Sequence, residues 1–117
     1  MKDYRELQVW RKAHDLTLAI YQTIKHFPND ERFGLVSQLR RAAGSIGSNI
    51  AEGCGRSSDP DFARCCQIAM GSACEVNYQL LLARDLGYLP DSEHDRLNGL
   101  VCEVQRMLTA LLARIRS

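Results

Sequence analysis

Long apolar runs are missing from this sequence, and so is any large excess of charge of one sign. No uninterrupted apolar segment approaches the ~18 residues that a membrane-spanning helix needs, and Met1 to Glu6 do not read as a signal peptide. The formal net charge is only +1, so the chain lacks the overall positive field that concentrates a protein on nucleic acid. We therefore expect a cytoplasmic protein with no membrane partner.

Paired metal-binding spacings are also missing. The five cysteines include no C-x-x-C pair, and the three histidines are not arranged as H-x-x-x-H. A free cysteine often behaves as a small buried apolar residue. We interpret the cysteines as structural, with metal binding or redox chemistry as minor alternatives, and we expect neither a metal nor a cofactor.

The composition is typical of one compact domain spanning residues 1–117. Apolar residues make up 45% of the chain and charged residues 25%, as in ordinary globular proteins. We find no internal repeat, low-complexity tract or convincing strand-like alternation. Apolar residues instead recur at steps of three and four, which is typical of amphipathic helices.

This periodicity predicts four helices separated by breaks that contain proline or glycine. The expected helices cover residues 5–26, 30–52, 60–86 and 91–115. Short connections favour antiparallel neighbours, so the fold class is all-α, an antiparallel up-down-up-down four-helix bundle. We expect Asn29 or Asp30 to be the N-cap of the second helix, and Ser58 or Asp59 that of the third. Gly87 is expected to follow the third helix in the left-handed conformation. Ser92 to Asp95 are expected to form a capping box at the start of the fourth helix.

The apolar stripes predict the core. They consist of Leu7, Trp10, Ala13, Thr17, Ile20 and Ile24; Leu35, Leu39, Ala42, Ala43, Ile46 and Ile50; Phe62, Cys66, Ala69, Ala73, Val76, Leu80 and Ala83; and Leu97, Val101, Val104, Leu108, Leu111 and Ile115. Within the second expected helix, residues 42–48 are almost all small. Gly44 and Gly47 each cost ~1 kcal/mol relative to alanine in a helix, so we expect either close approach of a neighbouring helix or a kink.

The densest polar constellation lies on the second helix and in the loop after it. Its members are Arg40, Arg41, Ser45, Ser48, Asn49, Glu52 and Arg56. Most are three or four residues apart and therefore share one helix face. One interpretation is a structural polar network that includes Ser48, Ser72 and Glu75, in which Glu75 forms an ion pair with Arg40 or Arg41.

The alternative interpretation is a surface that binds an anion or a partner chain. Its residues would be Arg40, Arg41, Ser45, Asn49, Glu52 and Arg56. A catalytic interpretation, with Ser45, Asn49, Glu52 and Glu75 converging, is the weakest, because no histidine or acid pair accompanies the serines in local sequence. We expect no catalytic residues.

Charge is distributed unevenly along the chain. The first 58 residues carry a net charge of +3 and the remainder −2, and residues 32–51 contain three arginines and no acid. Such patches can contact phosphates, although a solvated helix face is the default interpretation. The aromatic residues Tyr4, Trp10, Tyr21 and Tyr88 are not interleaved with basic residues densely enough to indicate a base-stacking platform.

Several segments resemble one known family. They are residues 4–13, the stretch from Gln38 to Gly53, and Ala69 to Ser72 followed by Glu75. The chain resembles the bacterial four-helix-bundle proteins first noticed in intervening sequences of large-subunit ribosomal RNA genes. The similarity covers nearly the whole chain, and the run from Arg-Arg-Ala to Asn-Ile-Ala-Glu-Gly is its most specific part.

The resemblance implies an antiparallel four-helix bundle that assembles into a homopentameric ring, and it implies no established activity. A related branch serves diversity-generating retroelements, in which a basic pentamer binds nucleic acid and a reverse transcriptase. We therefore predict a non-enzymatic homo-oligomeric scaffold, pentameric by resemblance, whose first partner is itself. The alternative is an accessory protein that binds structured RNA or a nucleoprotein.

Overall fold

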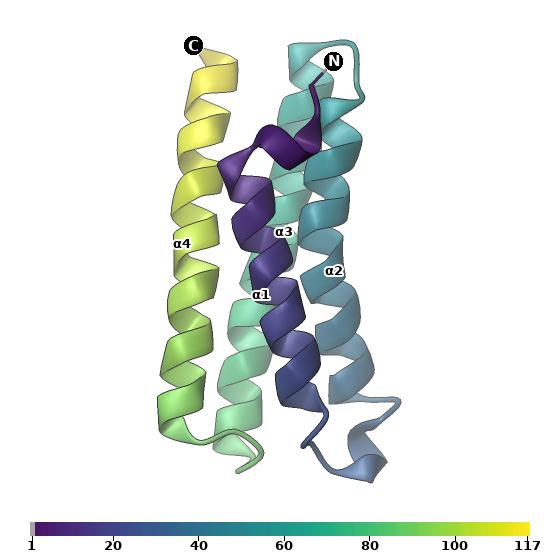
Figure 1. The fold of residues 1–117 in the computed structure, drawn as a ribbon, viewed down its shortest axis with the longest axis vertical. Coiled ribbons are helices and arrows are strands. Elements are labelled where there is room, and N and C mark those ends of the chain that lie inside the picture. Colours follow the sequence, from purple (N-terminus) through teal and green to yellow (C-terminus); the bar gives the residue numbers. More distant parts are fainter. Residues whose placement is uncertain (1) are drawn as a thin grey trace.

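The computed structural model describes residues 2–117 and contains four long helices. Their bounds are α1 Gln8–Ile24, α2 Leu35–Cys54, α3 Asp59–Asp85 and α4 Asp91–Arg116, with short 3-10 helices η1 Tyr4–Glu6 and η2 Asn29–Glu31 before α1 and α2. Successive helices run in opposite directions, and both chain ends lie at the same end of the bundle as the α2–α3 loop (Figure 1). The predicted all-α up-down-up-down bundle is confirmed, and residues 2–117 contain no strand.

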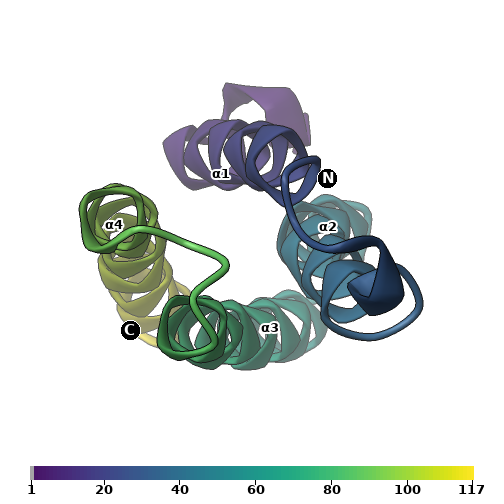
Figure 2. The same cartoon turned by 90° about the horizontal axis from the view of Figure 1, so that it is seen from below.

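The helices form a four-sided bundle in which α3 lies diagonally opposite α1. Seen along the bundle, α1, α2, α3 and α4 follow one another around its sides (Figure 2). Each helix packs against its two neighbours in this order, α1 against α4 included, and α2 and α3 pack most extensively. Over residues 2–117 the backbones of the diagonal pairs do not approach each other closely. Short connections keep successive helices adjacent, which produces this order.

The core matches the predicted stripes on α2 and α3 and differs on α1. All the residues predicted for α2 and α3 are buried. The buried residues of α1 are Val9, Ala13, Leu16, Ile20 and Ile24. Trp10 and Thr17, which we expected inside, lie at the edge of the core facing α2. Thr17 Oγ1 donates to the carbonyl oxygen of Ala43 at 3.0 Å, and Trp10 stacks on His14 with ring centroids 5.0 Å apart.

The helix ends were predicted with mixed success. Ser58 is the N-cap of α3 and its hydroxyl accepts from the Asp61 amide at 3.3 Å, while Gly87 has a φ of 83° after α3; both predictions are confirmed. Helix α2 begins later than predicted, because η2 and Gly34 intervene. The Glu31 carboxylate, rather than Asn29 or Asp30, accepts from the first α2 amide at 3.1 Å.

The predicted capping box of α4 is wrong. Its N-cap is Pro90, with no side-chain hydrogen bond, so Ser92 already lies inside the helix and cannot cap it. None of the helices within residues 2–117 combines the length and apolar character that a membrane crossing requires.

Helices α2 and α3 approach each other closely at Gly53. A Cβ atom built there would lie 2.8 Å from Phe62 Cδ1 and 2.9 Å from Cys65 Cβ, whereas one built at Gly44 would meet nothing within 4 Å. At Gly47 the nearest atom would be Trp10 Nε1 at 3.4 Å. Within the small-residue strip, Gly47 therefore lies close to α1 and Gly44 leaves open space, while the tight α2–α3 contact occurs at Gly53, beyond the strip.

Candidate functional site

A small polar cluster joins α2 to α3 near the middle of the bundle. Asn49 Nδ2 donates to the carbonyl oxygen of Ser45 at 2.8 Å and to its Oγ at 2.9 Å. Ser72 Oγ, which is buried, donates to Ser45 Oγ at 3.0 Å. The four-residue spacing of Ser45 and Asn49 places them on one face of α2, and the antiparallel packing of α3 brings Ser72 opposite. Three of the predicted site residues thus meet.

Ser48 and Glu75, expected in the same network, do not join it. Both are exposed, and neither side chain makes a hydrogen bond or ion pair with another described residue. Ser72 is buried where α3 faces α2, whereas Glu75, although only three residues later, lies at the outer border of that face and is exposed. The expected ion pair between Glu75 and Arg40 or Arg41 is consequently absent within residues 2–117.

An ion pair between the last turn of α2 and the loop after it forms the far end of the predicted surface. Arg56 donates to the Glu52 carboxylate at 2.6 Å in the i,i+4 arrangement, and both side chains are about half exposed. This hydrogen bond raises the pKa of Arg56. The two charges offset each other, so Arg56 is not an isolated cation, and Glu52 does not converge with Ser45 and Glu75 as the catalytic interpretation required.

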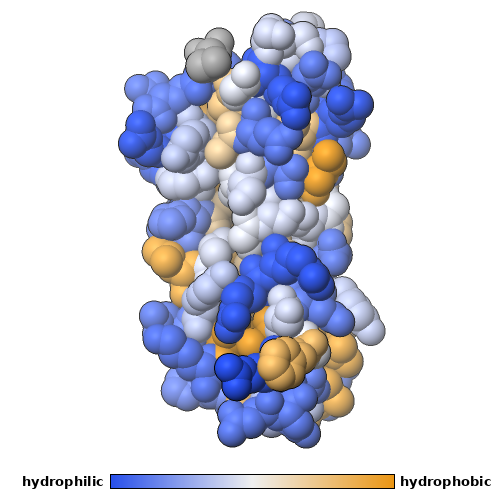
Figure 3. Space-filling model, turned by 90° about the vertical axis from the view of Figure 1, so that its right-hand side faces the viewer, coloured by the Kyte–Doolittle hydropathy of each residue, from blue (hydrophilic) through white to orange (hydrophobic). Residues whose placement is uncertain are grey.

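Arg40 and Arg41 supply the unopposed positive charge of this surface. The Arg40 guanidinium lies 5.5 Å from the centre of the Tyr21 ring on α1. Neither arginine has a carboxylate within 4.0 Å among the described residues. Figure 3 looks onto the α2 side and shows a pale, near-neutral strip across the middle of the surface, bordered by hydrophilic residues.

Sequence reasoning missed the outer face of α3. Ile68, Tyr78 and Leu81 are 51%, 61% and 36% exposed, and they are spaced so that they share one side of the helix with Gly71 and Glu75. The signal was present, because large apolar residues also stand on the side of α3 opposite its predicted core stripe, which weakens the amphipathic contrast of this helix. We call these five residues the α3 face.

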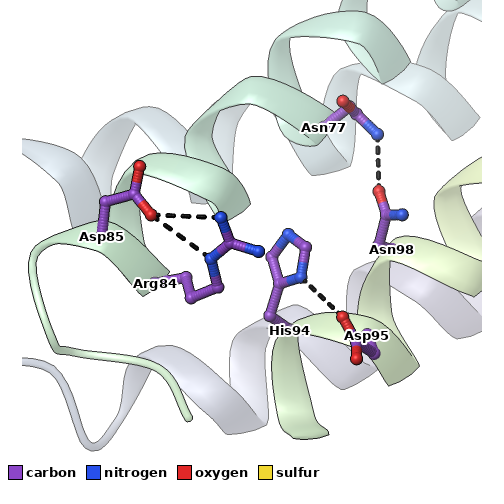
Figure 4. Close-up of polar contacts among 6 residues, drawn as sticks. All are labelled: Asn77, Arg84, Asp85, His94, Asp95 and Asn98. Atoms are coloured by element: carbon purple, nitrogen blue, oxygen red, sulfur yellow. Dashed lines mark hydrogen bonds and ion pairs between the residues drawn. The ribbon is translucent and has the colours of Figure 1, made fainter. Parts of the chain in front are cut away.

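Polar side chains lie along the contact between α3 and α4, and no local sequence motif predicted them. Asn77 Nδ2 donates to Asn98 Oδ1 at 2.6 Å, and the buried His94 has Nδ1 3.1 Å from Asp95 (Figure 4). Figure 4 also shows the Arg84 guanidinium, which pairs with Asp85 at 3.3 Å, directed toward the His94 ring. Of these three contacts, the Asn77–Asn98 hydrogen bond is the one that joins α3 to α4 and so helps to fix their register.

The cysteines occupy varied environments and none forms a disulfide. Cys54, Cys65 and Cys66 are buried, Cys102 is half-buried and Cys74 is exposed. Burial raises the pKa of the Cys66 thiol to about 11. Within residues 2–117 no three potential ligands of the histidine, cysteine and carboxylate types gather at one point.

The fold and surface define a class of protein: an antiparallel four-helix bundle with a serine–asparagine cluster between two helices and an apolar outer face on its third helix. The family model described as 23S rRNA-intervening sequence protein matches residues 5–110, and the chain belongs to this family. The resemblance found in the sequence is thereby confirmed.

A solved structure supports the same assignment. It is described as a protein with unknown function from the S23 ribosomal protein family of Bacteroides thetaiotaomicron. It shares 27% sequence identity with this chain, superposes with a TM-score of 0.83, and the match covers 89% of this chain and 97% of the other. No curated protein matches the chain. Neither description names a biochemical activity.

Proposed function

We propose that this chain is a non-enzymatic scaffold subunit that assembles with copies of itself, in a ring of five by family resemblance, and presents the α2 surface between Arg40 and Arg56 to a partner. The α3 face carries the proposal. Its three large apolar side chains lie in water in the isolated chain, and burying apolar surface contributes about 25 cal/mol per Å². Several large exposed apolar residues on one side of a helix are typical of an interaction site.

Self-association is favoured as the use of this face because most soluble oligomers are built from identical chains with closed symmetry. The polar cluster of Ser45, Asn49 and Ser72 supports a structural rather than a chemical role for the middle of α2, since its groups satisfy one another. The unopposed Arg41 and the exposed Ser48 remain available on the outside of the bundle.

Sedimentation velocity at micromolar concentration tests the proposal. The wild-type chain is expected to sediment at a multiple of its 13.2 kDa mass. Tyr78→Lys places a charge in the α3 face and is expected to give monomer. Ala113→Lys adds the same charge at an exposed position of α4 and is expected to leave the assembly intact. A monomeric wild type would contradict the proposal.

RNA binding is the second candidate, and the aromatic residues near the start of α2 favour it. Phe33 is 89% exposed, and the Arg32 guanidinium lies 5.5 Å from the centre of its ring. Arg40 lies similarly over Tyr21. An exposed ring beside a cation is suited to stacking on an unpaired base while contacting phosphate.

Fluorescence anisotropy across a salt series tests this candidate. It measures the affinity of the protein for a structured ribosomal RNA fragment, with duplex DNA as the comparison. Binding through phosphates is expected to weaken steeply with salt. The Arg40→Ala/Arg41→Ala double variant is expected to flatten that slope, while Arg106→Ala, an exposed arginine on α4, serves as the control. Unchanged affinity in the double variant would exclude both arginines from an RNA site.

A further inference from the structure

The α3 face carries a charge at its centre. Glu75 lies between Ile68 and Gly71 on one side and Tyr78 and Leu81 on the other, and it is exposed with no ion pair among the described residues. Nearby cations on α3 are already engaged: Arg64 pairs with Asp61 at 3.6 Å, and Arg84 with Asp85 at 3.3 Å. Covering this face therefore removes an unpaired carboxylate from water unless the partner supplies a cation.

This central carboxylate argues against a two-fold contact between two α3 faces. In such a contact each surface meets its own copy, so residues at the centre lie near their own equivalents across the axis. Two Glu75 carboxylates would then face each other in a surface that offers no free cation. Desolvating like charges together is unfavourable, and removing the partner of a buried charge is strongly destabilising.

A second surface of the same chain has the complementary character. Leu18 and Tyr21 on α1 are 52% and 41% exposed, and Arg40 of α2 lies over the Tyr21 ring. Arg40 has no carboxylate within 4.0 Å among residues 2–117. Beside it, Gly44 leaves space in which a Cβ atom would meet nothing within 4 Å. We call these four residues the α1–α2 face.

We propose that the α3 face of one copy docks on the α1–α2 face of the next copy, with Glu75 paired to Arg40 of its neighbour. The inference rests on the proposed self-assembly and names the two surfaces that meet. It uses Arg40 between copies and leaves the part of the proposed partner surface from Arg41 to Arg56 for the partner. Apolar side chains lie on both surfaces, a carboxylate faces a guanidinium, and the gap at Gly44 receives a side chain from the α3 face.

The two surfaces lie on different sides of the bundle, because α3 is diagonally opposite α1 (Figure 2). One copy can therefore hold two neighbours at once, one through each surface. Such head-to-tail contacts generate a closed ring when the rotation between copies closes, and a filament when it does not.

Charge reversal tests the pairing. Glu75→Arg and Arg40→Glu each bring like charges together, and each is expected to release monomer at concentrations where the wild type is fully assembled. The variant carrying both reversals is expected to recover the wild-type mass, because every contact again joins an acid to a base. Arg106→Glu on α4 lies outside both faces and is the matched control, expected to remain assembled. Circular dichroism checks that each variant is folded.

Mixing the two single variants tests the geometry of the contact. Neither variant is expected to assemble alone, because like charges meet at every contact. In an alternating arrangement of the two variants, every contact pairs opposite charges. An equimolar mixture is therefore expected to assemble, and strict alternation closes a ring only with an even number of subunits. A wild-type ring of five would accordingly change its subunit number in the mixture.

The failures are distinguishable. A monomeric wild type would overturn the proposed scaffold itself. A wild type that assembles, together with an Arg40→Glu variant that assembles equally well, would overturn only the docking of α3 on the α1–α2 face. Loss of assembly in both single variants without recovery in the double variant would likewise exclude the Glu75–Arg40 pair.

Discussion

Ser72 of α3 donates a hydrogen bond to Ser45 of α2 over 3.0 Å, although the two residues are far apart in the sequence. The same Ser45 hydroxyl accepts from Asn49 at 2.9 Å, so a single oxygen links one turn of α2 to the neighbouring helix. Because Ser72 is buried, this contact replaces water that its hydroxyl would otherwise bind.

Ser72→Ala is expected to lower the free energy of unfolding by about 1 kcal/mol, the usual net contribution of one hydrogen bond. Ser48→Ala removes an exposed hydroxyl that has no partner among residues 2–117 and is the matched control, expected within about 0.5 kcal/mol of wild type. Urea denaturation followed by circular dichroism, at one protein concentration, measures both. Equal stabilities would show that the bond contributes nothing.

Gly53→Ala is expected to destabilise the fold by about 1–3 kcal/mol, because the added methyl would lie 2.8 Å from the Phe62 ring and the helices must move apart. Gly99→Ala, where a Cβ meets nothing within 4 Å, is expected to stabilise the fold by about 0.4–1 kcal/mol through helix propensity. Thermal unfolding measures the stability of both variants. A stabilised Gly53→Ala variant would contradict the close α2–α3 approach.

Tyr88 makes the stability of the fold depend on pH. Its hydroxyl donates to Glu31 at 2.9 Å, and this bond raises the pKa of the Tyr88 phenol above its ordinary value of about 10. The folded protein holds the proton more tightly than the unfolded chain does. The contact therefore stabilises the fold fully below that ordinary pKa and loses its contribution as pH rises through the raised value.

Tyr88→Phe keeps the ring that packs 5.7 Å from Phe27 and removes only the hydroxyl. The stability difference between wild type and Tyr88→Phe is expected to be constant through neutral pH and to shrink in the alkaline range. Denaturation at a series of pH values measures it. A difference that grows with pH would contradict this assignment.

Thiol reactivity is expected to follow burial. Cys74 is exposed, whereas Cys66 is fully buried and its thiol has a pKa of about 11, so the reactive thiolate is scarce there at neutral pH. Iodoacetamide followed by peptide mass spectrometry is expected to find Cys74 alkylated long before Cys66, and both modified in denaturant. Early alkylation of Cys66 would indicate that the core opens.

Local patterns were enough to predict the helices and most of the core. The spacing of apolar residues along α2 and α3 marks their inner faces, because a helix repeats its direction every three or four residues. Ser58 caps the start of α3, and Gly87 follows its end with a positive φ; both features depend only on nearby residues. The family resemblance followed from the same linear segments.

The candidate surfaces depended on how the helices pack. Spacing placed Ser45, Asn49 and Glu52 on one face. Only the rotation of α3 decided that Ser72 meets Ser45 while Glu75 is exposed, with no ion pair in the described part of the chain. Likewise Trp10 moved to the edge of the core because α2 presents Gly47 to it. The sequence by itself determined four amphipathic helices, since their pattern is local. Tertiary structure decided which polar groups are satisfied and which apolar residues remain uncovered, since both depend on the relative rotation of helices distant along the chain.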